Sequence, residues 1–160
     1  MTSTELFRFV VNSKERTVVC SALRTLQSVL RETMGLTGAK AGCRQGGCGA
    51  CAVLVDGELQ LACLLPVVEI DGRSVETVEG LSVDGLLDPV QEVFLDEFAL
   101  QCGFCTPGMV MATHALLRDN PEPTRTRITE ALSGNLCRCT GYEPILSAVE
   151  RVIREAETDR

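Results

Sequence analysis

Nine cysteines stand out in this chain of 160 residues, and eight of them fall into two groups. In the first group, Cys43, Cys48 and Cys51 form a C-x4-C-x2-C run, and Cys63 follows alone. Thiolate sulfur binds iron and zinc, and this spacing is typical of plant-type [2Fe-2S] ferredoxins. Four glycines within residues 42–49 leave room for backbone N–H groups to approach the sulfur atoms. The first group therefore predicts a [2Fe-2S] cluster.

The second group combines two short cysteine pairs from distant parts of the chain. Cys102 and Cys105 form a C-x2-C pair, and Cys137 and Cys139 form a C-x-C pair. Each pair precedes an expected helix, whose free N–H groups and positive dipole end would stabilise thiolates and a negatively charged cluster. The spacing by itself fits either an iron-sulfur cluster or zinc, so both remain open at this point.

The cysteines could also form disulfides, bind zinc or pack in a hydrophobic core. Disulfides need an oxidising compartment, but the N-terminus has no basic segment followed by an apolar stretch, and the cysteine count is odd. We therefore expect a reduced, cytoplasmic chain. A zinc site usually pairs two short knuckles, whereas residues 43–51 hold three ligands in one loop. A loop this rich in glycine is also unsuited to a core of buried cysteines.

The remaining residues with reactive side chains offer no competing site. Cys20 lies on an expected strand and is interpreted as a small buried hydrophobe rather than a ninth ligand. His114 is the only histidine, which excludes a Rieske centre with its two histidine ligands. Arg44 and Arg138 adjoin expected ligands, where each either raises a cluster's potential or is simply solvated.

Charge and hydropathy limit the kinds of partner. The formal net charge is −7 and no Lys or Arg run is present, which disfavours nucleic-acid binding. No apolar run approaches about 18 residues, so no direct membrane insertion is expected. Partners are therefore expected to be proteins.

The first half of the chain is expected to form a mixed sheet crossed by one helix. Runs rich in Val and Phe flank a turn-forming Asn-Ser pair, and Asp-Gly pairs between apolar runs predict further hairpins. The expected elements are strands 5–11, 16–20, 52–55 and 58–62, a helix from a Ser21 cap to Leu30, and a third strand pair around Asp71-Gly72.

The second half is expected to be helical. Asp88 as cap and Pro89 in the first turn open the first helix, and no alternating strand pattern follows. The expected helices are 89–98, 109–118, 126–132 and 144–155. The fold class is therefore α+β, with two domains at residues 1–79 and 80–160.

Three segments, CRQGGCGAC, QCGFCTPGM and GNLCRCTGY, together resemble the small iron-sulfur subunit of the xanthine oxidase family of molybdenum hydroxylases. The resemblance covers nearly the whole chain. It implies a plant-type ferredoxin-like (β-grasp) domain followed by a four-helix [2Fe-2S] domain. One departure is Ala52, where the family often has Thr. The implied ligands are Cys43, Cys48, Cys51 and Cys63 for one cluster and Cys102, Cys105, Cys137 and Cys139 for the other.

The resemblance also implies a role in a larger complex. Gln101 and Cys139 match positions that contact a molybdopterin, expected in its dinucleotide form on a large molybdenum subunit. Single electrons would pass from molybdenum through the helical cluster, then the ferredoxin-like cluster, to FAD on a medium subunit or to another acceptor. A dimer of heterotrimers is implied, and no catalytic residue is expected in this chain. The rival readings are a free-standing ferredoxin or redox regulator and a zinc-bound adaptor.

Overall fold

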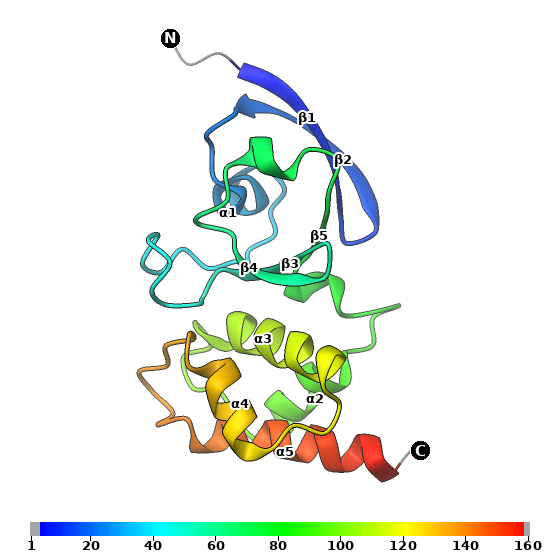
Figure 1. Cartoon of the computed structure of the whole chain (residues 1–160), viewed down its shortest axis with the longest axis vertical. Helices are drawn as coiled ribbons and strands as arrows, with labels where there is room; N and C mark the ends of the chain where they lie inside the picture. The colour runs from blue at the N-terminus through cyan, green and yellow to red at the C-terminus, as the bar shows by residue number, and fades with distance from the viewer. Residues whose placement is uncertain (1–3, 159–160) are drawn as a thin grey trace.

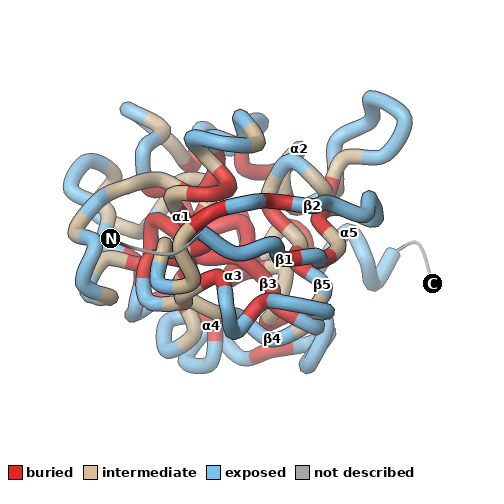
Figure 2. Tube along the Cα trace, turned by 90° about the horizontal axis from the view of Figure 1, so that it is seen from above, coloured by how far each residue is buried: buried red, intermediate tan, exposed pale blue. Residues whose placement is uncertain are grey.

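The structure, a computed structural model, describes residues 4–158, so the outer ends of the two expected domains, 1–3 and 159–160, lie outside it. A sheet with short helical segments occupies one half of the molecule, and longer helices occupy the other (Figure 1). Buried segments run through the middle of the molecule (Figure 2). The arrangement is mixed α and β, as expected.

The chain opens with the expected hairpin. Strands β1 (Thr4–Val11) and β2 (Lys14–Ser21) pair antiparallel along their whole length. Asn12 and Ser13 between them both take left-handed backbone conformations, with φ of 49° and 63°. A two-residue turn of this kind matches the twist of the strands that it joins, so the hairpin is confirmed.

A second hairpin completes the sheet. Strands β3 (Ala52–Val55) and β4 (Glu58–Leu61) pair antiparallel around the expected Asp56-Gly57 turn. Strand β5 (Ser74–Glu76) pairs parallel to β1 and antiparallel to β3. The sheet order is therefore β2-β1-β5-β3-β4, which makes it mixed, as expected.

The expected third strand pair around Asp71-Gly72 is wrong in its first arm. Only the second arm is a strand, and the first is the 3-10 helix η2 (Val67–Ile70). Val67 and Ile70 are both fully buried. Residues three apart face the same side of a 3-10 helix, whereas in a strand they would face opposite sides, so burial of both favours the helix.

The helix that crosses the sheet begins later than expected. It consists of α1 (Leu26–Ser28) continued by the π-helical turn η1 (Val29–Thr33), and its cap is Thr25, not Ser21. The residues before Thr25 pair with a neighbouring segment instead: the Val67 N–H donates to the Arg24 carbonyl. This pairing keeps the chain extended until the Thr25 hydroxyl accepts from the Ser28 N–H.

The helical half contains the four expected helices. Asp88 caps the first of them in a reciprocal capping box with Gln91, and Pro89 stands in its first turn. None of the helices within residues 4–158 is long and apolar enough to cross a membrane. The helices are α2 (Pro89–Asp96), α3 (Thr106–Asp119), α4 (Arg125–Leu132) and α5 (Glu143–Thr158).

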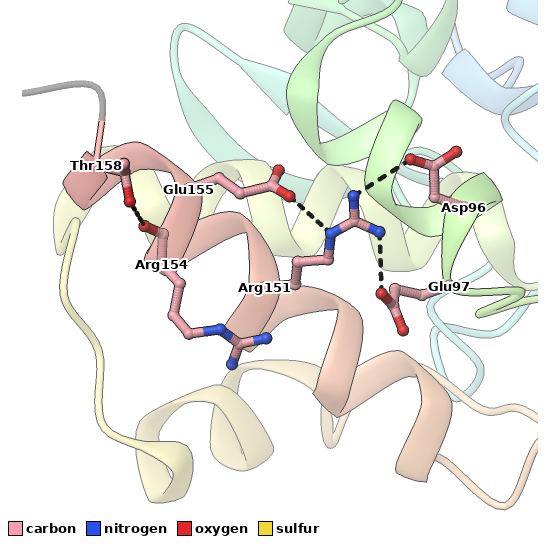
Figure 3. Close-up of polar contacts among 6 residues, drawn as sticks. All are labelled: Asp96, Glu97, Arg151, Arg154, Glu155 and Thr158. Carbon is pink, nitrogen blue, oxygen red and sulfur yellow. Dashed lines mark hydrogen bonds and ion pairs between the residues drawn. The ribbon is translucent and has the colours of Figure 1, made fainter.

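Helix α5 is tied to the C-terminal end of α2 by one arginine (Figure 3). Arg151 donates to Glu155 on its own helix at 2.7 Å and to Glu97 at 2.9 Å, and it lies 3.4 Å from Asp96. The carboxylates raise the pKa of the Arg151 guanidinium above its usual value. Each pair is partly exposed, so the contact orients the helices more than it stabilises them.

Strand β3 lies between two hydrophobic cores, and all four of its residues are buried. Ala52 and Leu54 pack in the helical core, while Val53 and Val55 pack in the core of the sheet half. Alternate side chains of a strand point to opposite faces, so one strand serves both cores. Helix α3 packs against β3 and lies just below it in Figure 1.

Because both faces of β3 are buried, truncating Leu54, which is 1% exposed, should destabilise the protein strongly. Leu54→Ala should lower the free energy of unfolding by about 2 to 5 kcal/mol, because it opens a cavity between α3 and the sheet. Urea denaturation followed by circular dichroism measures this. Leu59→Ala, the same change at the neighbouring partly exposed position of β4, is the control and should cost much less. Equal losses in the two variants would contradict this account of β3.

Candidate metal centres

The first cysteine group lies in an irregular loop that leads into β3, and Cys63 follows β4. Backbone N–H groups of this loop point at sulfur. The Cys43 sulfur accepts from the Gly47 N–H at 3.2 Å and from the Gln45 N–H at 3.5 Å, while the Cys43 N–H donates to the Cys48 sulfur at 3.4 Å. The approach of backbone donors, expected from the glycines, is therefore present.

Two glycines of this loop leave no space for a side chain. A Cβ on Gly42 would lie 2.8 Å from the Cys48 sulfur. Gly49 has a φ of +70°, and a Cβ there would lie 2.6 Å from the Gly134 carbonyl oxygen. The first glycine thus allows the backbone to close around the sulfur, and the second allows contact with a distant loop.

The thiols of the first group differ in how readily they ionise. Hydrogen bonds from the Gln45 N–H, from Cys48 and from other backbone N–H groups lower the pKa of Cys43 to about 7. Burial, together with the adjacent Cys63 thiol, raises the pKa of Cys51 to about 12. A buried thiolate of this kind needs a nearby cation, and iron supplies one. The donor set therefore fits a metal cluster.

The second group forms where two loops meet. Cys105 occupies the N-cap position of α3, close after Cys102, as the sequence predicts. Cys137 and Cys139 lie in the loop between α4 and α5. The sulfur atoms of Cys102 and Cys139 lie 3.5 Å apart, and the side chains of Cys105 and Cys137 also interact. Residues from distant parts of the chain therefore form one group of four sulfurs.

Local hydrogen bonds hold the Cys137 loop in shape. The Cys137 sulfur lies 3.1 Å from the Thr140 hydroxyl oxygen and accepts from the Thr140 N–H at 3.5 Å. Burial opposes ionisation of this thiol, but these hydrogen bonds bring its pKa down to about 7. The Cys137 N–H donates to the Tyr142 hydroxyl at 2.9 Å. In contrast, burial and the neighbouring Cys137 raise the pKa of Cys105 to about 12.

The sulfurs of the second group are arranged in pairs. A [2Fe-2S] cluster needs four thiolates in two pairs, one for each iron. The two contacts, Cys102 with Cys139 and Cys105 with Cys137, have this arrangement.

The other predicted residues lie as follows. Gln101, Cys102 and Cys139 are exposed at one end of the second group. Cys20 is 6% exposed and packs in the core of the sheet half, as interpreted from the sequence. His114 lies on α3 away from both groups, with its Nε2 3.8 Å from an Asp88 carboxylate oxygen.

Sequence reasoning missed two residues near the cysteines, Asn135 and Tyr142. Asn135 is 4% exposed, and its side-chain N–H donates to the Gly49 carbonyl at 3.2 Å. The Tyr142 hydroxyl donates to the Asn135 backbone carbonyl at 3.3 Å. The only signal for them was their place beside the C-x-C pair in the segment GNLCRCTGY.

Known families and proteins match both halves of the chain. Residues 9–82 match the family described as "2Fe-2S iron-sulfur cluster binding domain", and residues 77–150 match "[2Fe-2S] binding domain". The nicotine 6-hydroxylase small subunit of Paenarthrobacter nicotinovorans is 53% identical over 87% of this chain and 84% of its own length. A probable xanthine dehydrogenase subunit from Bacillus subtilis (strain 168) is 44% identical over 98% of this chain and 90% of its own length.

A solved structure has the same fold. The crystal structure of quinoline 2-oxidoreductase from Pseudomonas putida 86 contains a chain with a TM-score of 0.92 and 43% identity, covering 98% of both chains. The two matching 2Fe-2S domains, the cysteine geometry and these relatives agree. The chain therefore belongs to the iron-sulfur small subunits of the xanthine oxidase family of molybdenum hydroxylases.

Proposed function

We propose that this chain relays single electrons from a molybdenum-pterin centre on a large partner subunit, through two [2Fe-2S] clusters, to a flavin or other acceptor. The observation that carries the proposal is a direct hydrogen bond between the two cysteine loops: the Leu136 N–H donates to the Cys48 carbonyl at 3.0 Å. Leu136 precedes Cys137 in the chain, so one hydrogen bond and a short stretch of backbone link a residue of each group. When bound, each cluster would accept and pass on one electron.

We assign the ligands by the two groups of sulfurs. Within the second group, the observed pairing supports one iron held by Cys102 and Cys139 and the other by Cys105 and Cys137. The domain division that we propose is a ferredoxin-like β-grasp domain at residues 1–79 and a four-helix domain at residues 80–160. The ligands of the first cluster would be Cys43, Cys48, Cys51 and Cys63.

The residues exposed beside the second group support the proposal that a partner subunit binds there. Gln101 and Cys139 are exposed, which would let them face a molybdopterin, expected as the dinucleotide, on the large subunit. Leu136 and Phe104, which adjoin Cys137 and Cys105 in the sequence, are 58% and 48% exposed. Exposed apolar side chains are typical of protein interfaces. We extend the proposal to a medium FAD subunit and to a dimer of heterotrimers, by analogy with the family.

The surface around the first group would be the side from which electrons leave for the acceptor. Arg44, Gln45 and Gly47, around Cys43, are exposed, which would let an acceptor approach that side. We also infer a cytoplasmic location, because the ligand thiols must stay reduced to bind iron, and all nine cysteines are free.

The ligand assignment predicts about four iron and four acid-labile sulfide per chain, since each [2Fe-2S] cluster carries two of each, with negligible zinc. Cys48→Ser and Cys105→Ser should each lose one cluster, about half of the iron. Cys20→Ser is the matched control and should keep both clusters, because Cys20 packs in the sheet core. Metal analysis and electron paramagnetic resonance measure this. Loss of iron from the Cys20 variant, or stoichiometric zinc in the wild type, would overturn the assignment.

The order of transfer predicts different kinetics for two variants of the complete complex. In Cys48→Ser, substrate should still reduce the second cluster rapidly, while turnover to the external acceptor fails, because only the far cluster is damaged. In Cys105→Ser, reduction of the remaining cluster should also be blocked. Rapid-freeze electron paramagnetic resonance after substrate addition distinguishes the two signals. Should the cluster that remains in Cys105→Ser fill at the wild-type rate, the proposed order would be reversed.

A further inference from the structure

Asn135 connects the two ligand loops through its side chain. It follows α4 in the loop that carries Cys137, yet its Nδ2 donates to the carbonyl of Gly49, 86 positions away in the loop of the first group. The side chain is 4% exposed, so this bond is protected from competing water. In Figure 1 the loop around residues 40–50, in cyan, and the loop around residues 133–142, in orange, lie on the same side of the molecule.

Two hydrogen bonds join the two ligand loops. The Leu136 N–H donates to the Cys48 carbonyl, and the Asn135 side chain donates to the next carbonyl along, that of Gly49. A single hydrogen bond would let the loops pivot about one point. Two neighbouring bonds fix the orientation of one loop relative to the other.

The backbones packed around Asn135 leave no space for a Cβ at Gly49 or Gly108. A Cβ on Gly49 would lie 2.6 Å from the Asn135 Nδ2. A Cβ on Gly108 of α3 would lie 2.4 Å from the Gly49 carbonyl oxygen and 3.0 Å from the same Nδ2. Three segments therefore meet at Asn135, and two of them contribute only backbone there.

The backbone of Asn135 is fixed on the side of the second group. Its N–H donates to the Leu132 carbonyl at the end of α4 at 2.9 Å. Its carbonyl accepts from the Tyr142 hydroxyl at 3.3 Å, and that hydroxyl accepts from the Cys137 N–H at 2.9 Å. Asn135 is thus attached to a proposed ligand of the second cluster by its main chain and to the loop of the first by its side chain.

We propose that Asn135 is a positioning residue that sets the separation and relative orientation of the two clusters. The inference rests on the proposed relay function, because it assigns to Asn135 the geometry on which transfer between the clusters depends. We do not propose Asn135 as a cluster ligand. Its side-chain nitrogen donates to the Gly49 carbonyl and is packed against Gly49 and Gly108.

The test uses the complete complex with Asn135→Ala. Asn120→Ala is the matched control, because Asn120 is an exposed asparagine at the end of α3 that accepts from the Glu122 N–H and lies outside both cysteine groups. Iron is quantified first. The magnetic interaction between the two reduced clusters is then measured by electron paramagnetic resonance, since this interaction falls steeply with their separation. Rapid freezing after substrate addition gives the rate of transfer between the clusters.

Asn135→Ala should keep four iron per chain, change the splitting of the two cluster signals and slow electron transfer between them, because tunnelling falls off with the separation of the clusters. Asn120→Ala should match the wild type. Unchanged splitting and rate in Asn135→Ala would overturn the inference, as would loss of iron, which would assign Asn135 to loop assembly. A wild-type complex without two reducible clusters would instead overturn the proposed function itself.

Discussion

Negative charge held away from water is the constraint on which the rest of this structure depends. Each cysteine group must become thiolate to bind iron, and burial opposes ionisation at Cys51 and Cys105. The chain compensates with backbone rather than with basic side chains: N–H groups surround the Cys43 sulfur, and Cys105 stands at a helix N-terminus. Backbone N–H groups must come close to the sulfur atoms, which explains why the loop is rich in glycine. The strands and helices around the loop hold it in that shape.

Patterns of neighbouring residues were enough to predict the elements whose form is decided locally. The turn at Asn12-Ser13, the cap at Asp88 and the four helices of the second half are all confirmed. The errors lie where contacts between distant segments override local preference. Around Thr25 the chain pairs with another segment before it coils, and η2 forms because two of its residues must be buried on one side.

The candidate site divides in the same way. Spacing alone groups Cys43, Cys48 and Cys51, because ligands that share a short loop lie close whatever the fold. Spacing alone predicted the second group only as two pairs, because their meeting depends on how the loop between α4 and α5 packs against the start of α3. The family resemblance implied that they share one cluster. The contact between Asn135 and Gly49 had no local signal at all, because hydrogen bonds between remote loops leave no periodicity in the sequence.

Strand β3 has a consequence for how the protein loses its structure. Because Leu54 packs with the helices and Val53 with the sheet half, neither hydrophobic core can open without exposing a strand that belongs to the other. Two halves joined only by a linker would melt in separate steps. From this shared strand we expect residues 4–158 to unfold cooperatively, with the backbone amides of β3 exchanging with solvent only through global opening.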